Sequence, residues 1–146
     1  MTEVAFHFGA PDKVAYTCRL LRKAVSAGAT VEVVSDPSTL GRLSSQLWAL
    51  SATDFVPHCI ASDPGAMREL SLVLLRQSPD SDPVTRRVLV NLGSTVPMGY
   101  ERFERLIEVV GLDDQDRSLA RERWKHYTQA GYTIVRHDLA LKGANP

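Results

Sequence analysis

The sequence predicts a single α/β domain with a mainly parallel central sheet. Short apolar or β-branched runs alternate with amphipathic helical patterns from the N-terminus onwards, an order typical of parallel sheets covered by helices. The chain has 146 residues, the length of one ordinary domain, with no internal repeat and no linker long enough to divide it. We therefore expect one domain over residues 1–146, built as a three-layer sandwich.

The first strand and helix are clearly marked. The apolar run Val4–Phe8 predicts a strand, and the turn after it contains a glycine and a proline. Asp12 is a suitable N-cap for a helix that continues to about Ala27, where Gly28 favours termination. This segment therefore opens the chain as a strand followed by a helix.

The second unit repeats the same order. The β-branched run Thr30–Val34 predicts a buried strand. Ser38 is a candidate N-cap for a helix over residues 40–49, which carries a stripe of leucines. Residues 51–67 follow as an irregular connection, with a short extended piece at residues 55–60. The resulting β-α-β-α order supports the parallel sheet.

Three further strands are expected in the middle of the chain. Two are the apolar runs Leu70–Leu75 and Val88–Leu92. Pro97–Glu104 predicts a short helix or turn. Leu106–Val110 could continue that helix, but its Leu-Ile-Glu-Val-Val sequence favours a strand.

A long helix and one strand complete the predicted fold. Asp113 or Asp114 caps the helix, which runs to about Ala130 and stops at Gly131. Tyr132–His137 is the last expected strand.

Composition excludes several classes of protein. The 17 basic residues balance the 17 acidic ones, so bulk attraction to nucleic acid or to a membrane is not expected. No apolar run approaches the roughly 20 residues of a membrane span, and residues 1–10 do not read as a secretory signal. We expect a cytosolic protein. Cys18 and Cys59 are far apart, which disfavours a zinc or redox motif; of a disulfide and two reduced thiols, we favour the thiols.

No cofactor or catalytic motif is evident. The loop after the first strand, residues 8–12, has neither glycine-rich nucleotide fingerprint, and the four histidines lack metal-ligand spacing. We therefore expect no cofactor and no metal. One catalytic alternative remains open, a small α/β enzyme that uses His58 with Asp54 and Asp63 of the irregular connection.

The last helix carries an unusual basic and aromatic stripe. At 100° per residue, one broad arc of this helix is expected to pack on the sheet, and it holds Leu119, Ala120, Tyr127 and Ala130. Beside it, Arg117, Arg121, Trp124 and Thr128 lie within about 60° of one another, and Lys125 lies just beyond them. Like charges four residues apart cost a helix roughly a few tenths of a kcal/mol, which suggests a partner that neutralises them. Three interpretations are open: a solvated basic face, a site for an acidic protein partner, or direct binding of single-stranded nucleic acid.

Two segments together resemble the chi subunit of bacterial DNA polymerase III holoenzyme. The first is Leu47-Trp48-Ala49 followed by Phe55-Val56-Pro57-His58. The second is Leu119-Ala120-Arg121-Glu122-Arg123-Trp124-Lys125-His126-Tyr127 followed by Ala130-Gly131-Tyr132. The resemblance covers essentially the whole chain. It implies a Rossmann-like α/β fold without a nucleotide-binding loop, and a non-catalytic accessory role in the clamp-loader complex.

The resemblance also implies two protein partners. The first is the acidic, Phe-terminated C-terminal tail of single-stranded-DNA-binding protein. Arg121 would hold its terminal carboxylate. The chain itself would contact nucleic acid only indirectly. The residues carried over to this site are Arg117, Arg121, Trp124, Lys125, Val110 and Thr128. Position 124 is Trp where relatives often carry Tyr, and position 117 is Arg where Lys also occurs.

The second implied partner is the psi subunit of the clamp loader. Trp48 and Phe55 would form the centre of its binding surface, and Pro57 would shape the segment. Family members also meet an accessory helicase through this surface, in competition with psi. Without the resemblance, Trp48 and Phe55 would be interpreted as core residues of a helix and a strand.

Overall fold

The computed structural model describes residues 2–49, 58–60, 73–76 and 87–139. Strands and helices alternate over residues 3–48, as the sequence predicts. The strands are Glu3–Ala10 (β1), Val31–Val34 (β2), His58–Ile60 (β3), Val73–Arg76 (β4), Val88–Asn91 (β5), Arg105–Gly111 (β6) and Ile134–Asp138 (β7). The helices are Lys13–Ser26 (α1), Pro37–Trp48 (α2), the 3-10 turn Tyr100–Arg102 (η1) and Asp114–Gln129 (α4).

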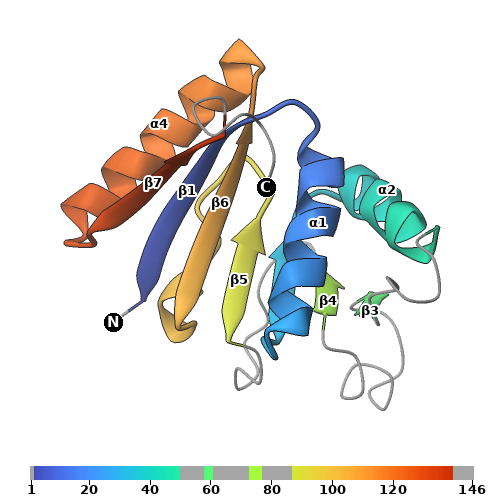
Figure 1. The fold of residues 1–146 in the computed structure, drawn as a ribbon. Helices are drawn as coiled ribbons and strands as arrows, with labels where there is room; N and C mark the ends of the chain where they lie inside the picture. Colours follow the sequence, from blue (N-terminus) through green and yellow to red (C-terminus); the bar gives the residue numbers. More distant parts are fainter. Residues whose placement is uncertain (1, 50–57, 61–72, 77–86, 140–146) are drawn as a thin grey trace.

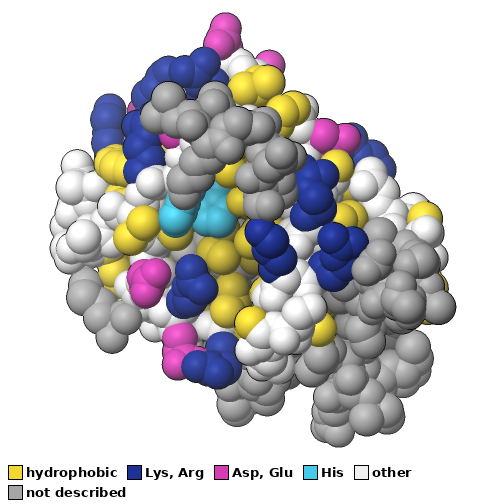
Figure 2. All heavy atoms as spheres, in the orientation of Figure 1, with side chains coloured by type: hydrophobic (Ala, Val, Ile, Leu, Met, Phe, Trp, Pro, Cys, Tyr) yellow, Lys and Arg dark blue, Asp and Glu magenta, His cyan; other side chains and the backbone are white. Residues whose placement is uncertain are grey.

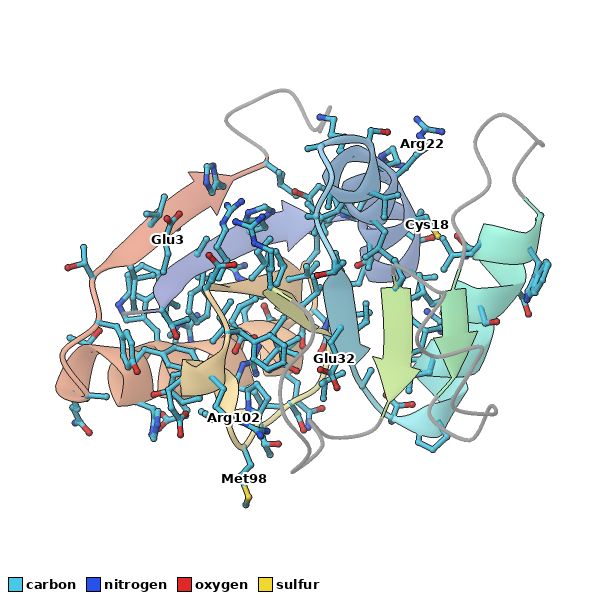
Figure 3. The ribbon with its side chains drawn as sticks, turned by 90° about the horizontal axis from the view of Figure 1, so that it is seen from below. Glu3, Cys18, Arg22, Glu32, Met98 and Arg102 are labelled. Carbon is cyan, nitrogen blue, oxygen red and sulfur yellow. The ribbon has the colours of Figure 1, made fainter. Side chains whose placement is uncertain are left out.

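The strands form one sheet in the order β3-β4-β2-β5-β6-β1-β7, and every neighbouring pair is parallel. Helices α1 and α2 cover one face, and α4 covers the other (Figure 1). Figure 3 gives the same division, with Cys18 and Arg22 on the α1 side and Met98 and Arg102 on the α4 side. The predicted α/β sandwich with a parallel sheet is therefore confirmed.

Each face of the sheet has its own hydrophobic core. In β6, Ile107 and Val109 pack under α1 and α2, whereas Leu106 and Val110 pack under α4. This alternation follows from the two-residue period of side chains along a strand. Because both faces are covered, the sheet accepts the continuous apolar runs seen in the sequence.

The helix caps agree with the sequence at α1 and differ at α2. The Asp12 side chain accepts a hydrogen bond from the Ala15 backbone N–H, as an N-cap does. Helix α2 is capped by Asp36 rather than by Ser38. The proline at position 37 explains the shift, because proline is favoured at the first helical position and moves the cap one residue before itself.

The last strand begins at Ile134 rather than at the expected Tyr132. Gly131 has a φ of +92°, and the Tyr132 backbone N–H donates to the Tyr127 carbonyl at 3.0 Å. Tyr132 therefore completes the end of α4 and is not available for pairing in the sheet.

The Cys18 thiol is free and buried, and burial raises its pKa to about 11. This state agrees with the reduced thiol expected for Cys18. The side chain of Cys59 lies outside the described residues. Within those residues, no helix combines the length and the apolar character that a membrane span requires.

Candidate functional site

Helix α4 turns a mixed face towards the sheet. Its buried residues are Ala120, Arg123 and Tyr127. The sequence predicts burial for Ala120 and Tyr127 but not for Arg123, whose side chain is only 2% exposed. Ala130, expected on the buried face, is exposed. An arginine therefore replaces an apolar contact at the centre of the helix.

Arg123 belongs to a buried polar cluster around Glu108 of β6. The Arg123 Nε donates to Glu108 Oε1 at 3.0 Å, and the Tyr127 hydroxyl donates to Glu108 Oε2 at 2.5 Å. The Asn91 amide donates to both carboxylate oxygens at 3.1 Å, and Arg123 Nη1 donates to the Ser94 carbonyl at 3.1 Å. Burial raises the pKa of the Glu108 carboxyl, and the Arg123 guanidinium opposes that effect. The cluster holds α4 in one rotation about its axis.

That rotation leaves a shallow depression of about 440 Å³ between α4 and the edge of the sheet. Side chains from β1, α4 and β7 line it. They are Phe8, Arg117, Arg121, Trp124, Lys125 and Arg136. Figure 2 shows Lys and Arg side chains gathered over α4 and β7 on this side of the molecule. The depression therefore combines aromatic surface with four basic side chains.

The aromatic part of the depression is fixed by packing. The Trp124 ring lies 5.0 Å from that of Phe6 and 6.0 Å from that of Phe8, measured between centroids. The Arg136 guanidinium carbon lies 4.7 Å above the Phe8 ring, a cation–π contact, and its Nη2 lies 3.7 Å from an Asp138 oxygen. Trp124 is half-buried, so one side of its ring packs on the core while the rest remains open.

The cations of α4 are open to a ligand. Arg117, Arg121 and Lys125 are exposed. Lys125 lies 3.7 Å from Glu122, with both side chains largely exposed, so this ion pair contributes little. Among the described residues, Arg117 and Arg121 have no ion-pair partner. Their charge is available to a ligand that carries acidic groups.

Four of the six residues carried over to the first site meet in this depression: Arg117, Arg121, Trp124 and Lys125. Val110 does not line it. Its side chain is fully buried on β6 beneath α4, and its place in the binding site stays a prediction. Thr128 is exposed but outside the lining, and its hydroxyl donates to the Trp124 carbonyl at 2.9 Å.

The sequence missed two lining residues, Phe8 and Arg136. They lie in strands at opposite ends of the chain that pair side by side, with Phe6 opposite Arg136 and Phe8 opposite Asp138. In the sequence, Phe6 and Phe8 fall on the same side of the first strand, and this aromatic pair could have pointed to the aromatic part of the depression. The pairing of the first strand with the last could not be read from local pattern.

The second predicted surface is described only in part. Trp48 ends α2 and is 65% exposed, so its interpretation as a core residue is wrong. The neighbouring Leu47 is fully buried and anchors the helix. Phe55 and Pro57 lie outside the described residues. Helix α2 covers the face of the sheet opposite to α4 (Figure 1).

The catalytic alternative finds no support in the described residues. Asp54 and Asp63 lie outside them, as does the side chain of His58. Within the described ranges, no three His, Cys, Asp or Glu side chains are grouped as metal ligands would be.

A crevice of about 670 Å³ does lie at the carboxyl ends of β2 and β5, where α/β proteins often bind ligands. Two acidic side chains of this crevice, Asp36 and Asp116, already make hydrogen bonds that stabilise the fold. Asp36 caps α2, and these hydrogen bonds lower its pKa. Asp116 accepts from Lys13 Nζ at 3.2 Å and from the Gly111 N–H at 2.7 Å. The lowered pKa of Asp36 is the opposite of the raised pKa that a general acid needs.

Comparison with known proteins identifies the family. Residues 1–135 match the family model described as DNA polymerase III chi subunit, HolC. The DNA polymerase III subunit chi of Pseudomonas aeruginosa is 28% identical over 123 residues, covering 84% of this chain and 83% of the relative. The subunit of the same name from Escherichia coli K12 is 32% identical over 96 residues, covering 64% and 62%.

Solved structures support the fold alone. The C-terminal domain of the DEAD-box protein Dbp5 superimposes with a TM-score of 0.62 at 13% identity, covering 95% of this chain and 91% of that domain. The S. cerevisiae Dbp5 L327V C-terminal domain, in its complex with Gle1 H337R and IP6, gives 0.63 at 12% identity, covering 94% and 90%. The family match over residues 1–135 carries the assignment: the chain belongs to the DNA polymerase III chi subunit family, a replication accessory subunit of the polymerase.

Proposed function

We propose that this chain is a non-catalytic adaptor of the clamp-loader complex. It links the psi subunit to the acidic C-terminal tail of single-stranded-DNA-binding protein, in the cytoplasm at the replisome. The observation that carries the proposal is the depression between α4 and β7, which places an aromatic floor beside four cations. A peptide that ends in an aromatic residue and carries acidic side chains matches both features.

The side chains of the depression suggest a role for each part of such a tail. Arg121 is exposed between the other two cations of α4 and can bind the terminal carboxylate with two parallel hydrogen bonds. Arg117 and Lys125 lie four residues to either side and face the acidic side chains. Trp124 and Phe8 offer ring faces to the terminal aromatic group, which gains from offset or edge contacts.

The same chemistry disfavours direct binding of nucleic acid. Non-specific binding of single strands relies on aromatic side chains that stack successive bases along a basic groove. Here Trp124 and Phe8 pack against each other in a single place, and their rings are 6.0 Å apart. The chain also has a net charge of zero. We infer that the chain contacts nucleic acid only through its protein partner.

The proposed psi surface is centred on Trp48. Large exposed aromatic side chains often supply most of the affinity of a protein interface. Because α2 and α4 cover opposite faces of the sheet, both partners can bind at once (Figure 1). Phe55 and Pro57 complete the proposed surface, and an accessory helicase would compete with psi for it.

The proposal is tested by titrating a labelled acidic peptide that ends in Phe against the whole chain. We expect a micromolar dissociation constant that weakens with salt, because exposed charges are screened. Arg121→Ala should weaken binding at least about tenfold, the loss of a charge-assisted pair. Arg19→Ala, on the exposed side of α1, is the matched control and should bind normally. Equal affinity for wild type and Arg121→Ala would sink the proposal.

A further inference from the structure

Strand β7 is an edge of the sheet, and the depression opens beside it. β7 is last in the strand order and pairs with β1 alone among the described strands. Its residue Arg136 lines the depression together with side chains of α4. In Figure 1, β7 and α4 run side by side along this border of the molecule. A peptide end held in the depression therefore lies next to a strand edge.

The direction of the β7 backbone groups follows from its pairing with β1. The Leu139 N–H donates to the Phe8 carbonyl at 2.9 Å, and Phe8 is registered with Asp138. In a parallel ladder, the residues before and after the registered one then face the partner strand, and alternate residues face away. The backbone N–H and C=O of Arg136 therefore point outward from the sheet.

The outer edge carries few of the devices that protect edge strands. β7 pairs with β1 over five consecutive residues without a register shift, so no bulge twists it away. Its sequence Ile-Val-Arg-His-Asp contains no proline. Val135, a β-branched residue suited to cross-strand packing, is 41% exposed. Within the strand, the charged side chains are the feature that disfavours pairing with another chain.

The spacing of the α4 cations matches the repeat of a strand. Alternate residues of an extended strand are about 6.6 Å apart. Residues four apart on a helix are separated by about 6.0 Å along its axis. Arg117, Arg121 and Lys125 have this spacing. Side chains on one face of a strand beside β7 would therefore meet the three cations in step.

We propose that the acidic segment of the bound tail adds to the outer edge of β7 as a further strand. This inference rests on the proposed function, because it assumes that the end of the tail occupies the depression. Main-chain hydrogen bonds to Arg136 would supply affinity. Alternate acidic side chains would face the α4 cations, and the intervening ones would cover Val135. This arrangement is strand addition at an exposed edge.

One test uses peptides with methylated backbone amides. Two versions of the acidic, Phe-terminated peptide are made, each N-methylated at two alternate positions, the second set shifted by one residue. Strand addition predicts that one set weakens binding about tenfold or more through lost hydrogen bonds, while the other changes it less than about threefold. Equal effects of the two sets would overturn strand addition. If the unmethylated peptide fails to bind, the proposed function itself is wrong.

A second test uses two substitutions at Arg136. Both Arg136→Ala and Arg136→Pro remove the side chain, but only the proline removes the outward N–H. Proline is tolerated in an edge strand where its missing N–H faces away from the sheet. We expect Arg136→Pro to bind the peptide at least about threefold more weakly than Arg136→Ala, with both folded by circular dichroism. Equal affinities of the two folded variants would contradict the inference.

Discussion

Replacing Arg123 by methionine tests the role of the buried cluster beneath the site. Arg123→Met keeps most of the length of the side chain but removes the charge that faces Glu108, 3.0 Å away. Glu108 is fully buried, so its carboxylate would remain without its counter-ion. The Tyr127 and Asn91 hydrogen bonds to that carboxylate would remain.

The expected loss of stability is large. Breaking a buried ion pair by removing one partner costs about 3–5 kcal/mol, and that is a substantial part of the roughly 5–15 kcal/mol that stabilises an ordinary domain. Without Arg123, the effect of burial dominates, and the pKa of Glu108 rises further above its unfolded value. The folded variant then binds more protons than the unfolded chain between those two pKa values. Its stability should therefore increase as the pH falls from 7 towards 5.

Urea unfolding followed by circular dichroism at pH 7 and pH 5 measures both effects. Arg117→Met is the matched control, the same substitution on the exposed side of the same helix, and should stay within about 0.5 kcal/mol of wild type. A loss of less than about 1 kcal/mol in Arg123→Met at pH 7 would refute the reasoning. So would a loss that does not shrink on acidification.

Three further outcomes are expected. Asp113→Ala removes the side chain that accepts from the Asp116 N–H at 3.1 Å and should cost about 0.5–2 kcal/mol in urea unfolding, with Asp114→Ala as a control that leaves the cap intact. Asp138→Asn removes an acidic group 3.7 Å from Arg136 and should tighten binding of the acidic peptide about twofold to threefold by fluorescence anisotropy; unchanged or weaker binding would contradict the role of Arg136. Raising salt from 50 to 200 mM should weaken peptide binding, and Arg117→Ala should reduce that dependence; an unaltered salt slope would count against Arg117 as a contact.

Local pattern predicts most of this fold because the relevant signals lie within a few residues. The β-branched run at residues 31–34 becomes the fully buried β2. Asp12 caps its helix as expected, and Asp113, one of the two candidates, caps the last helix. The seven-residue strand β6 forms where the alternative was a continued helix. Each of these outcomes depends on hydrogen bonding and side-chain periodicity close in the sequence.

The site could be predicted only in part, because its remaining features depend on contacts between distant segments. An arginine on a charged helix is normally exposed, and Arg123 is buried only because Glu108 lies opposite it. The glutamate within the apolar run of β6 is the single local hint of this pairing. Arg136 reaches the depression because β7 pairs with β1, a long-range register. Val110 is buried by the same alternation that places Leu106 under α4.

The most direct test of the adaptor function follows the two tryptophan indole N–H signals by nuclear magnetic resonance. The chain has two tryptophans, Trp124 beside the depression and Trp48 at the end of α2. Titration with the acidic, Phe-terminated peptide should shift the Trp124 signal progressively and leave the Trp48 signal in place. A peptide that moves the Trp48 signal alone, or neither signal at saturating concentration, would contradict the assignment of the α4 depression as the tail-binding site.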